Sequence, residues 1–72
     1  MSMTVSKYRA SLGLTLEAFA REFGKSKGHL CQIENDNRAP VKLALAIEAH
    51  SNGLVDAATL NEDVANARRV AA

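Results

Sequence analysis

One stretch, TLEAFAREFGKSKGHLCQI at residues 15–33, most constrains what this chain can fold into. Apolar residues recur across Leu16–Phe23 at the spacing of one helix face, which predicts a short amphipathic helix. Thr15 is placed to cap the start of that helix, because a threonine hydroxyl can accept a hydrogen bond from a free amide there. Gly24 is placed to end it, because glycine enters the left-handed conformation at little cost.

A second short helix is expected from its cap, Ser26, to about Asn35, with Leu30 and Ile33 on its inner face. Two short helices joined by a tight glycine turn form a helix-turn-helix, here residues 15–35. The predicted core of this motif combines a small residue at the closest helix crossing, the turn glycine and three apolar residues: Ala20, Phe23, Gly24, Leu30 and Ile33.

Further helices are expected on both sides of this motif. The first runs from about Thr4 to Leu12 and ends at Gly13. Another begins at Pro40, which is tolerated in a first turn, and ends at Gly53. Their inward residues are predicted to be the apolar ones: Val5, Tyr8, Leu12, Leu43, Ala44 and Ile47.

A last helix, at about 61–70, is predicted from an apolar stripe of Leu60, Val64 and Ala67. Either Asp56 or Asn61 is expected to cap the segment after the preceding helix. This last helix either completes the core or forms a two-fold interface between copies. Arg68 and Arg69 are interpreted as charges favoured by the dipole at a helix C-terminus, with a second phosphate contact as the alternative.

Length and composition bound the fold and the chemistry. The chain has 72 residues, enough for one domain with a small core. Its 47% hydrophobic content includes many alanines, which favours closely packed short helices. We therefore predict an all-α fold, a compact bundle of about five short helices. The single cysteine, Cys31, excludes an internal disulfide, and neither it nor His50 has an evident partner for a metal site.

Residues 5–51 resemble the helix-turn-helix of the Cro and lambda-repressor (XRE) family. The resemblance includes Arg9 before the motif and Glu34 and Asn35 after it, and it departs at Asp36, where the family usually has glycine. The tail IEAHSNGLVDAATLNEDV is similar to that of small YdaS-like prophage regulators. The family implies a structural ion pair between Arg9 and Glu34, and a lambda repressor-like fold that binds a double-stranded DNA operator.

In such a motif the second helix enters the major groove. Glutamine can pair with adenine there, and lysine can donate to guanine. The candidate base contacts lie in the N-terminal or outward part of that helix: Lys27, Gly28, His29 and Gln32. The candidate phosphate contacts are hydroxyl, amide and basic groups that flank it, partly by analogy with the family: Thr15, Lys25, Ser26, Asn35, Asn37, Arg38 and Lys42.

The charge distribution agrees with a DNA-facing half, although ordinary solvated charge would look similar. Residues 7–42 contain seven Lys and Arg against four Asp and Glu, whereas residues 43–72 contain two against four. We expect a cytoplasmic protein, because no signal peptide or apolar stretch of about 18 residues is evident. We also expect a transcriptional repressor that acts as a homodimer, because one recognition helix covers only a few base pairs. The alternatives are a protein-interaction module, such as an antitoxin, and a small RNA-binding regulator. No catalytic constellation, cofactor site or small-molecule site is evident.

Overall fold

Six short helices follow one another in the computed structural model, which describes residues 3–71. They are α1 (Val5–Ser11), α2 (Leu16–Glu22), α3 (Lys27–Asp36), α4 (Val41–His50), α5 (Ala57–Leu60) and α6 (Glu62–Ala71). No strand occurs within this described part of the chain. The Cα radius of gyration is 11.7 Å, close to the roughly 11 Å of a compact domain of this length. The predicted all-α class is confirmed, with one more helix than expected.

Side-chain caps set where the helices begin. Thr4, Thr15 and Ser26 have extended backbones, and each hydroxyl accepts a hydrogen bond from the amide three residues on, at 3.1, 3.1 and 3.2 Å. Asp56 caps α5 and Asn61 caps α6. The sequence left open whether Asp56 or Asn61 is a cap. Both residues are caps, because the one-turn helix α5 lies between them.

Residues with a positive φ set where the helices end. Gly24 follows α2 with φ +64°, and the chain leaves α1 and α4 through Gly13 and Gly53. α3 ends differently, because Asp36 is still helical and Asn37 takes the left-handed conformation with φ +54°. Asparagine tolerates this conformation better than most residues with a Cβ, so α3 can end without a glycine.

The core lies where α1 to α5 meet, and its largest fully buried side chains include Phe19, Leu30 and Ile47. Phe23 is half-buried and packs against this core. The prediction that Leu12 points inward is wrong, since Leu12 is 43% exposed. α1 ends one residue earlier, at Ser11, so Leu12 lies in the turn, and the half-buried Leu14 packs against the core instead.

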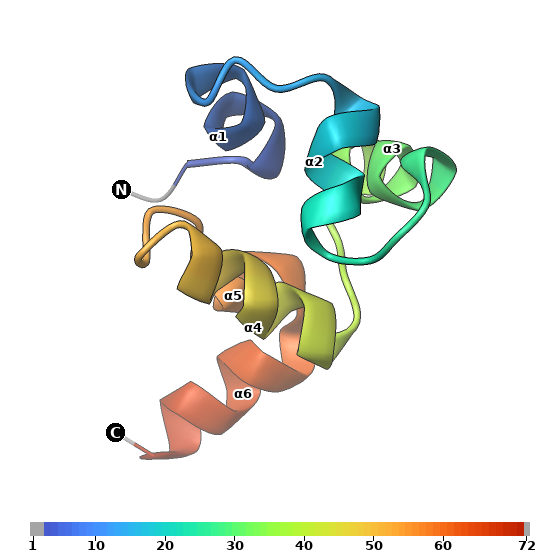
Figure 1. Ribbon diagram of the computed structural model, residues 1–72. Coiled ribbons are helices and arrows are strands. Elements are labelled where there is room, and N and C mark those ends of the chain that lie inside the picture. Colours follow the sequence, from blue (N-terminus) through green and yellow to red (C-terminus); the bar gives the residue numbers. More distant parts are fainter. Residues whose placement is uncertain (1–2, 72) are drawn as a thin grey trace.

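The molecule has two ends (Figure 1). The α2–α3 pair lies at one end, α6 lies at the other, and α4 and α5 lie between them. α2 packs chiefly against α3, and α5 packs against both α4 and α6. Among the helices of residues 3–71, none has both the length and the apolar character needed to cross a membrane.

Arg68 fastens α6 to the middle of the molecule. Its guanidinium donates to both carboxylate oxygens of Glu48, at 2.7 and 2.8 Å, and to Asp56 at 2.8 Å. Both roles considered for Arg68 from the sequence miss this contact, which joins residues 20 and 12 positions apart. The bonds from Arg68, and a further one from the Ala57 amide at 3.0 Å, lower the pKa of Glu48 from 4.5 to about 2.

The lowered pKa of Glu48 makes stability depend on pH. Between about pH 4.5 and pH 2, Glu48 is protonated in the unfolded state but stays ionised in the folded state. Acidification through this window therefore lowers the free energy of unfolding. Glu48→Gln removes the charge but keeps an oxygen for the Ala57 amide. We expect the variant to melt below wild type near neutral pH, and the difference to close as pH falls through this window.

Thermal unfolding followed by circular dichroism over a pH series measures this difference. Glu17→Gln is the matched control, because Glu17 forms an i,i+4 pair with Arg21 in which both side chains are largely exposed, and such pairs contribute little. A difference for Glu48→Gln that stays constant down to pH 2 would contradict the assignment.

Candidate nucleic-acid interface

α3 separates its buried and exposed residues onto opposite sides. Leu30 and Ile33 are 0% and 3% exposed and belong to the core. Gly28 and Gln32 are exposed and lie one turn apart. Asn35 is also exposed, one turn beyond, on the same side. We call Gly28, Gln32 and Asn35 the α3 outer face; its side chains contribute nothing to the core.

Gly28 has no packing reason to be glycine. Its φ is not positive, and a Cβ built on it would meet nothing within 4 Å. A glycine inside a helix costs about 1 kcal/mol relative to alanine. No contact within the fold offsets this cost. Because Gly28 has no side chain, the α3 outer face is flat there, and another molecule can approach the backbone.

Four exposed cations surround α3 without internal partners. Lys25 and Lys27 lie at its start, and Arg38 and Lys42 follow its end. Among the described residues, no carboxylate lies within 4.0 Å of any of the four. Three arginines elsewhere do pair with carboxylates: Arg9, Arg21 and Arg68. Of the Lys and Arg side chains of residues 3–71 that lack such a partner, only Lys7 and Arg69 lie elsewhere. Four of these six cations therefore lie around α3, where they remain available for an anionic partner.

The structure brings Arg9 and Glu34 together. The guanidinium donates twice to the carboxylate, at 2.7 and 3.2 Å, and once to the Leu14 carbonyl at 2.9 Å. The first of these bonds is the main reason that the pKa of Arg9 is raised. The pair joins α1, the turn after it and α3, and it therefore fixes how α3 is turned about its axis.

Thr15 and Ser26 use their hydroxyl oxygens as caps, which leaves each hydroxyl proton free to donate to a second partner. His29 supplies the capped amide of α3 and is half-buried. Its ring therefore lies at the edge of the exposed surface, in contrast to Lys27 and the α3 outer face.

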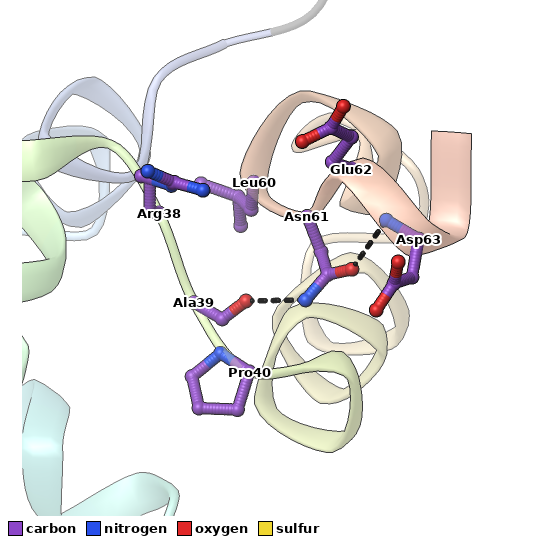
Figure 2. A pocket seen from close by; sticks show the side chains of 7 residues that line it. All are labelled: Arg38, Ala39, Pro40, Leu60, Asn61, Glu62 and Asp63. Carbon is purple, nitrogen blue, oxygen red and sulfur yellow. Dashed lines mark hydrogen bonds between the residues drawn. The ribbon is translucent and has the colours of Figure 1, made fainter. Parts of the chain in front are cut away.

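The loop after α3 is held by the junction of α5 and α6 (Figure 2). The Ala39 amide donates to the Leu60 carbonyl at 2.8 Å, and the Asn61 side-chain amide donates to the Ala39 carbonyl at 2.9 Å. The other end of the Asn61 side chain accepts from the Asp63 amide at 2.9 Å. Arg38, next to this clamp, lines a pocket of about 360 Å³ beside the junction. The sequence predicts Asn61 only as a cap.

His50 has hydrogen-bond and packing partners that the sequence does not reveal. Its Nδ1 lies 2.7 Å from the Tyr8 hydroxyl, which also lies 2.9 Å from the His50 carbonyl. Its Nε2 lies 3.4 Å from Glu22, and the Phe19 and Phe23 rings lie within 6.2 Å. His50 of α4 therefore links α1 and α2 to its own helix.

Residues 3–71 contain no group of three His, Cys, Asp or Glu side chains that could hold a metal ion. Comparisons with protein families, with curated proteins and with solved structures found no significant match to this chain. The α3 outer face and the cations around it are accordingly the features from which a function can be argued.

Because the space around Gly28 is open, Gly28→Ala should raise the free energy of unfolding by about 0.5–1 kcal/mol. Urea unfolding measures this gain. Gly24→Ala is the matched control and should lower stability, since its φ of +64° strains any residue with a Cβ. A loss of stability in Gly28→Ala would mean that Gly28 is needed by the fold itself.

Proposed function

We propose that this protein is a sequence-specific, double-stranded DNA-binding transcriptional regulator, most simply a Cro-like repressor. In this proposal α2 and α3 form a lambda repressor-like helix-turn-helix, and α3 is its recognition helix. The observation that carries the proposal is the α3 outer face. Its residues are exposed, do not pack in the core, and have four unpaired cations around them.

The α3 outer face suits the major groove. An α-helix with its side chains is roughly 10–12 Å wide, and the major groove is about 12 Å wide. The Gln32 amide offers a donor and an acceptor, which match N6 and N7 of adenine. Lys27, in the first turn, can donate to guanine, and Gly28 allows close approach of the helix. Base reading is accordingly assigned to the first turn and the outward side of α3, with His29 at the edge.

Phosphate contacts are assigned to both sides of α3. Lys25 and the Ser26 hydroxyl precede the helix, and Arg38 and Lys42 follow it. Contacts of this kind fix the register of a protein on the duplex and supply most of the salt-dependent affinity. Three further polar candidates complete the proposed set. Thr15 caps the start of α2, Asn35 lies in the last turn of α3, and Asn37 ends α3.

A single recognition helix covers only a few base pairs. Two copies related by a two-fold axis place two such helices in successive major grooves, about 34 Å apart. We therefore include a homodimer in the proposal, with an operator made of two similar half-sites.

Gln32→Ala tests base reading. The change removes an exposed side chain, so the fold should remain intact. Affinity for an operator selected from a random duplex library should fall by about 1–3 kcal/mol, with relaxed preference at one or two positions per half-site. Affinity for random duplex should barely change, because phosphate contacts carry it.

Anisotropy titrations against the operator, its single-base variants and random duplex at fixed salt measure these effects. Ser6→Ala is the control, because it removes an exposed polar group from α1, outside the proposed contact set and away from α6. Equal loss on every duplex, or no loss on any, would refute Gln32 as a base reader. Tighter binding to RNA than to any duplex would favour an RNA-binding regulator.

Arg38→Ala and Lys42→Ala test the phosphate contacts. Each should weaken specific and non-specific binding alike, and each should reduce the slope of log affinity against log salt by about one. Lys7→Ala is the control, since Lys7 is an exposed cation on α1 outside the proposed contact set. A change of base preference with an unaltered salt slope would show that these residues do not contact phosphate.

A further inference from the structure

A pocket of about 360 Å³ lies between the turn that follows α2 and the first half of α4. Figure 1 shows these two segments next to each other. The lining combines charged and apolar side chains: Glu22, Phe23, Lys25, Lys42, Leu43 and Ala46. We call this the α2–α4 pocket. Because α3 separates its two segments in the chain, no local sequence pattern predicts it.

The apolar part of the pocket consists of Phe23, Leu43 and Ala46. Leu43 belongs to the core and is 5% exposed, whereas Phe23 is half-buried and Ala46 is exposed. Two neighbouring rings hold the Phe23 ring, since its centroid lies 5.1 Å from that of Phe19 and 5.2 Å from that of His50. An aromatic ligand can pack here against the accessible part of the Phe23 ring and against the Ala46 methyl group.

The charged part of the pocket has an excess of positive charge. Lys25 and Lys42 line it, and neither forms an ion pair within residues 3–71. Glu22 is the one acid in the lining, and its carboxylate lies 3.4 Å from His50 Nε2. The backbone at Lys25 is fixed, because its amide donates to the Ala20 carbonyl at 3.0 Å. An anionic group can therefore bind beside the lysines without first having to order the turn.

We propose that the α2–α4 pocket binds a small molecule that joins an aromatic ring to one carboxylate. The ring packs against Phe23 and Ala46, and the carboxylate lies within reach of Lys25 and Lys42. Ligand pockets typically enclose about 300–1,000 Å³ and combine apolar walls with a few convergent polar groups, as this one does. A single carboxylate balances two lysines and one glutamate. A neutral ring leaves that charge unmatched, and an inorganic anion leaves the apolar walls uncovered.

A ligand in this pocket competes with DNA, a consequence that rests on the proposed function. Lys25 and Lys42 are both assigned to DNA phosphates in that function. A carboxylate bound between them neutralises charge that the duplex would otherwise contact, so affinity falls for specific and non-specific duplexes alike. The ligand is therefore an effector that releases the protein from DNA without a change of fold.

Titration of the full chain with sodium 2-naphthoate, followed by amide proton–nitrogen NMR spectra without DNA, tests the binding site. We expect saturable shifts centred on residues 23–25 and 42–46, with a dissociation constant of about 1 mM or lower for a ligand of this size. The neutral 2-naphthamide should bind about fivefold more weakly, because it lacks the charge. Added salt should weaken the binding of naphthoate but not that of the amide.

Two variants act in opposite directions. Ala46→Glu puts a longer, negatively charged side chain at an exposed helical position, so α4 should stay folded while naphthoate affinity falls by about tenfold or more. Ala10→Glu is the matched control, because it makes the same change at an exposed position of α1, outside the pocket. Glu22→Gln should instead tighten binding by about twofold, because it removes the negative charge from the pocket.

Three outcomes would overturn the binding site: no saturable shift, shifts centred on another part of the chain, or equal affinity for naphthoate and the neutral amide. The spectra also report whether each variant keeps its fold.

Anisotropy titrations with random duplex, at an ionic strength held constant with sodium acetate, test the competition. Saturating naphthoate should weaken DNA binding by wild type about threefold or more, and it should add no weakening in Ala46→Glu. Naphthoate that saturates the pocket without weakening DNA binding would overturn the effector role. A chain that binds naphthoate but no duplex would refute the proposed function and not the pocket, so the two failures are distinguishable.

Discussion

The ion pair between Arg9 and Glu34 is the contact on which the arrangement of the α3 outer face depends. Both side chains are largely buried, at 24% and 9% exposure, and Arg9 also holds the Leu14 carbonyl. Removal of one member of such a pair leaves an uncompensated charge, which is strongly destabilising. Glu34 lies one turn after Leu30, so the pair and the core together fix the rotation of α3. With that rotation fixed, Gln32 can only face outward.

At the other end of the molecule, α6 is held by a second group of ion pairs, which is more exposed to solvent than the Arg9–Glu34 pair. Arg68 binds Glu48 and Asp56 at a surface where its own side chain is 45% exposed. Contacts between exposed side chains are screened by salt more than the shielded pair at Arg9. The contact that holds α6 is therefore more sensitive to salt than the contact that holds α3.

Features that depend on neighbours in sequence could be predicted from the residues themselves. A contact between distant residues could be predicted only where a family resemblance implied it, as for Arg9 and Glu34. The predicted caps at Thr15 and Ser26 act over three residues, so a local pattern reveals them. α5 is only one turn long, too short to show a helical period. Contacts between residues 42 and 20 positions apart depend on how the helices assemble, and these are the ones missed: Tyr8 with His50, and Glu48 with Arg68.

The candidate site also combines local features that the sequence predicts and features that appear only in the assembled structure. The outward direction of Gln32 follows from helical periodicity around Leu30 and Ile33, which the sequence contains. Within the described residues neither Lys25 nor Lys42 forms an ion pair, although Glu22 lines the same pocket as both lysines. This is a property of the assembled surface, because it depends on how the acids of other helices point. Net charge of +1 for the whole chain conceals this local excess.

The side chain of Asn61 connects the two ends of the molecule. Its oxygen begins α6 and its nitrogen holds the Ala39 carbonyl, one residue from Arg38 (Figure 2). A change that loosens the start of α6 therefore also releases the loop that follows α3. Thermodynamic linkage makes the effect reciprocal. A ligand that orders this loop stabilises α6, and an ordered α6 increases the affinity for that ligand by the same free energy. One amide thus gives a 72-residue chain a route by which its far ends can influence each other.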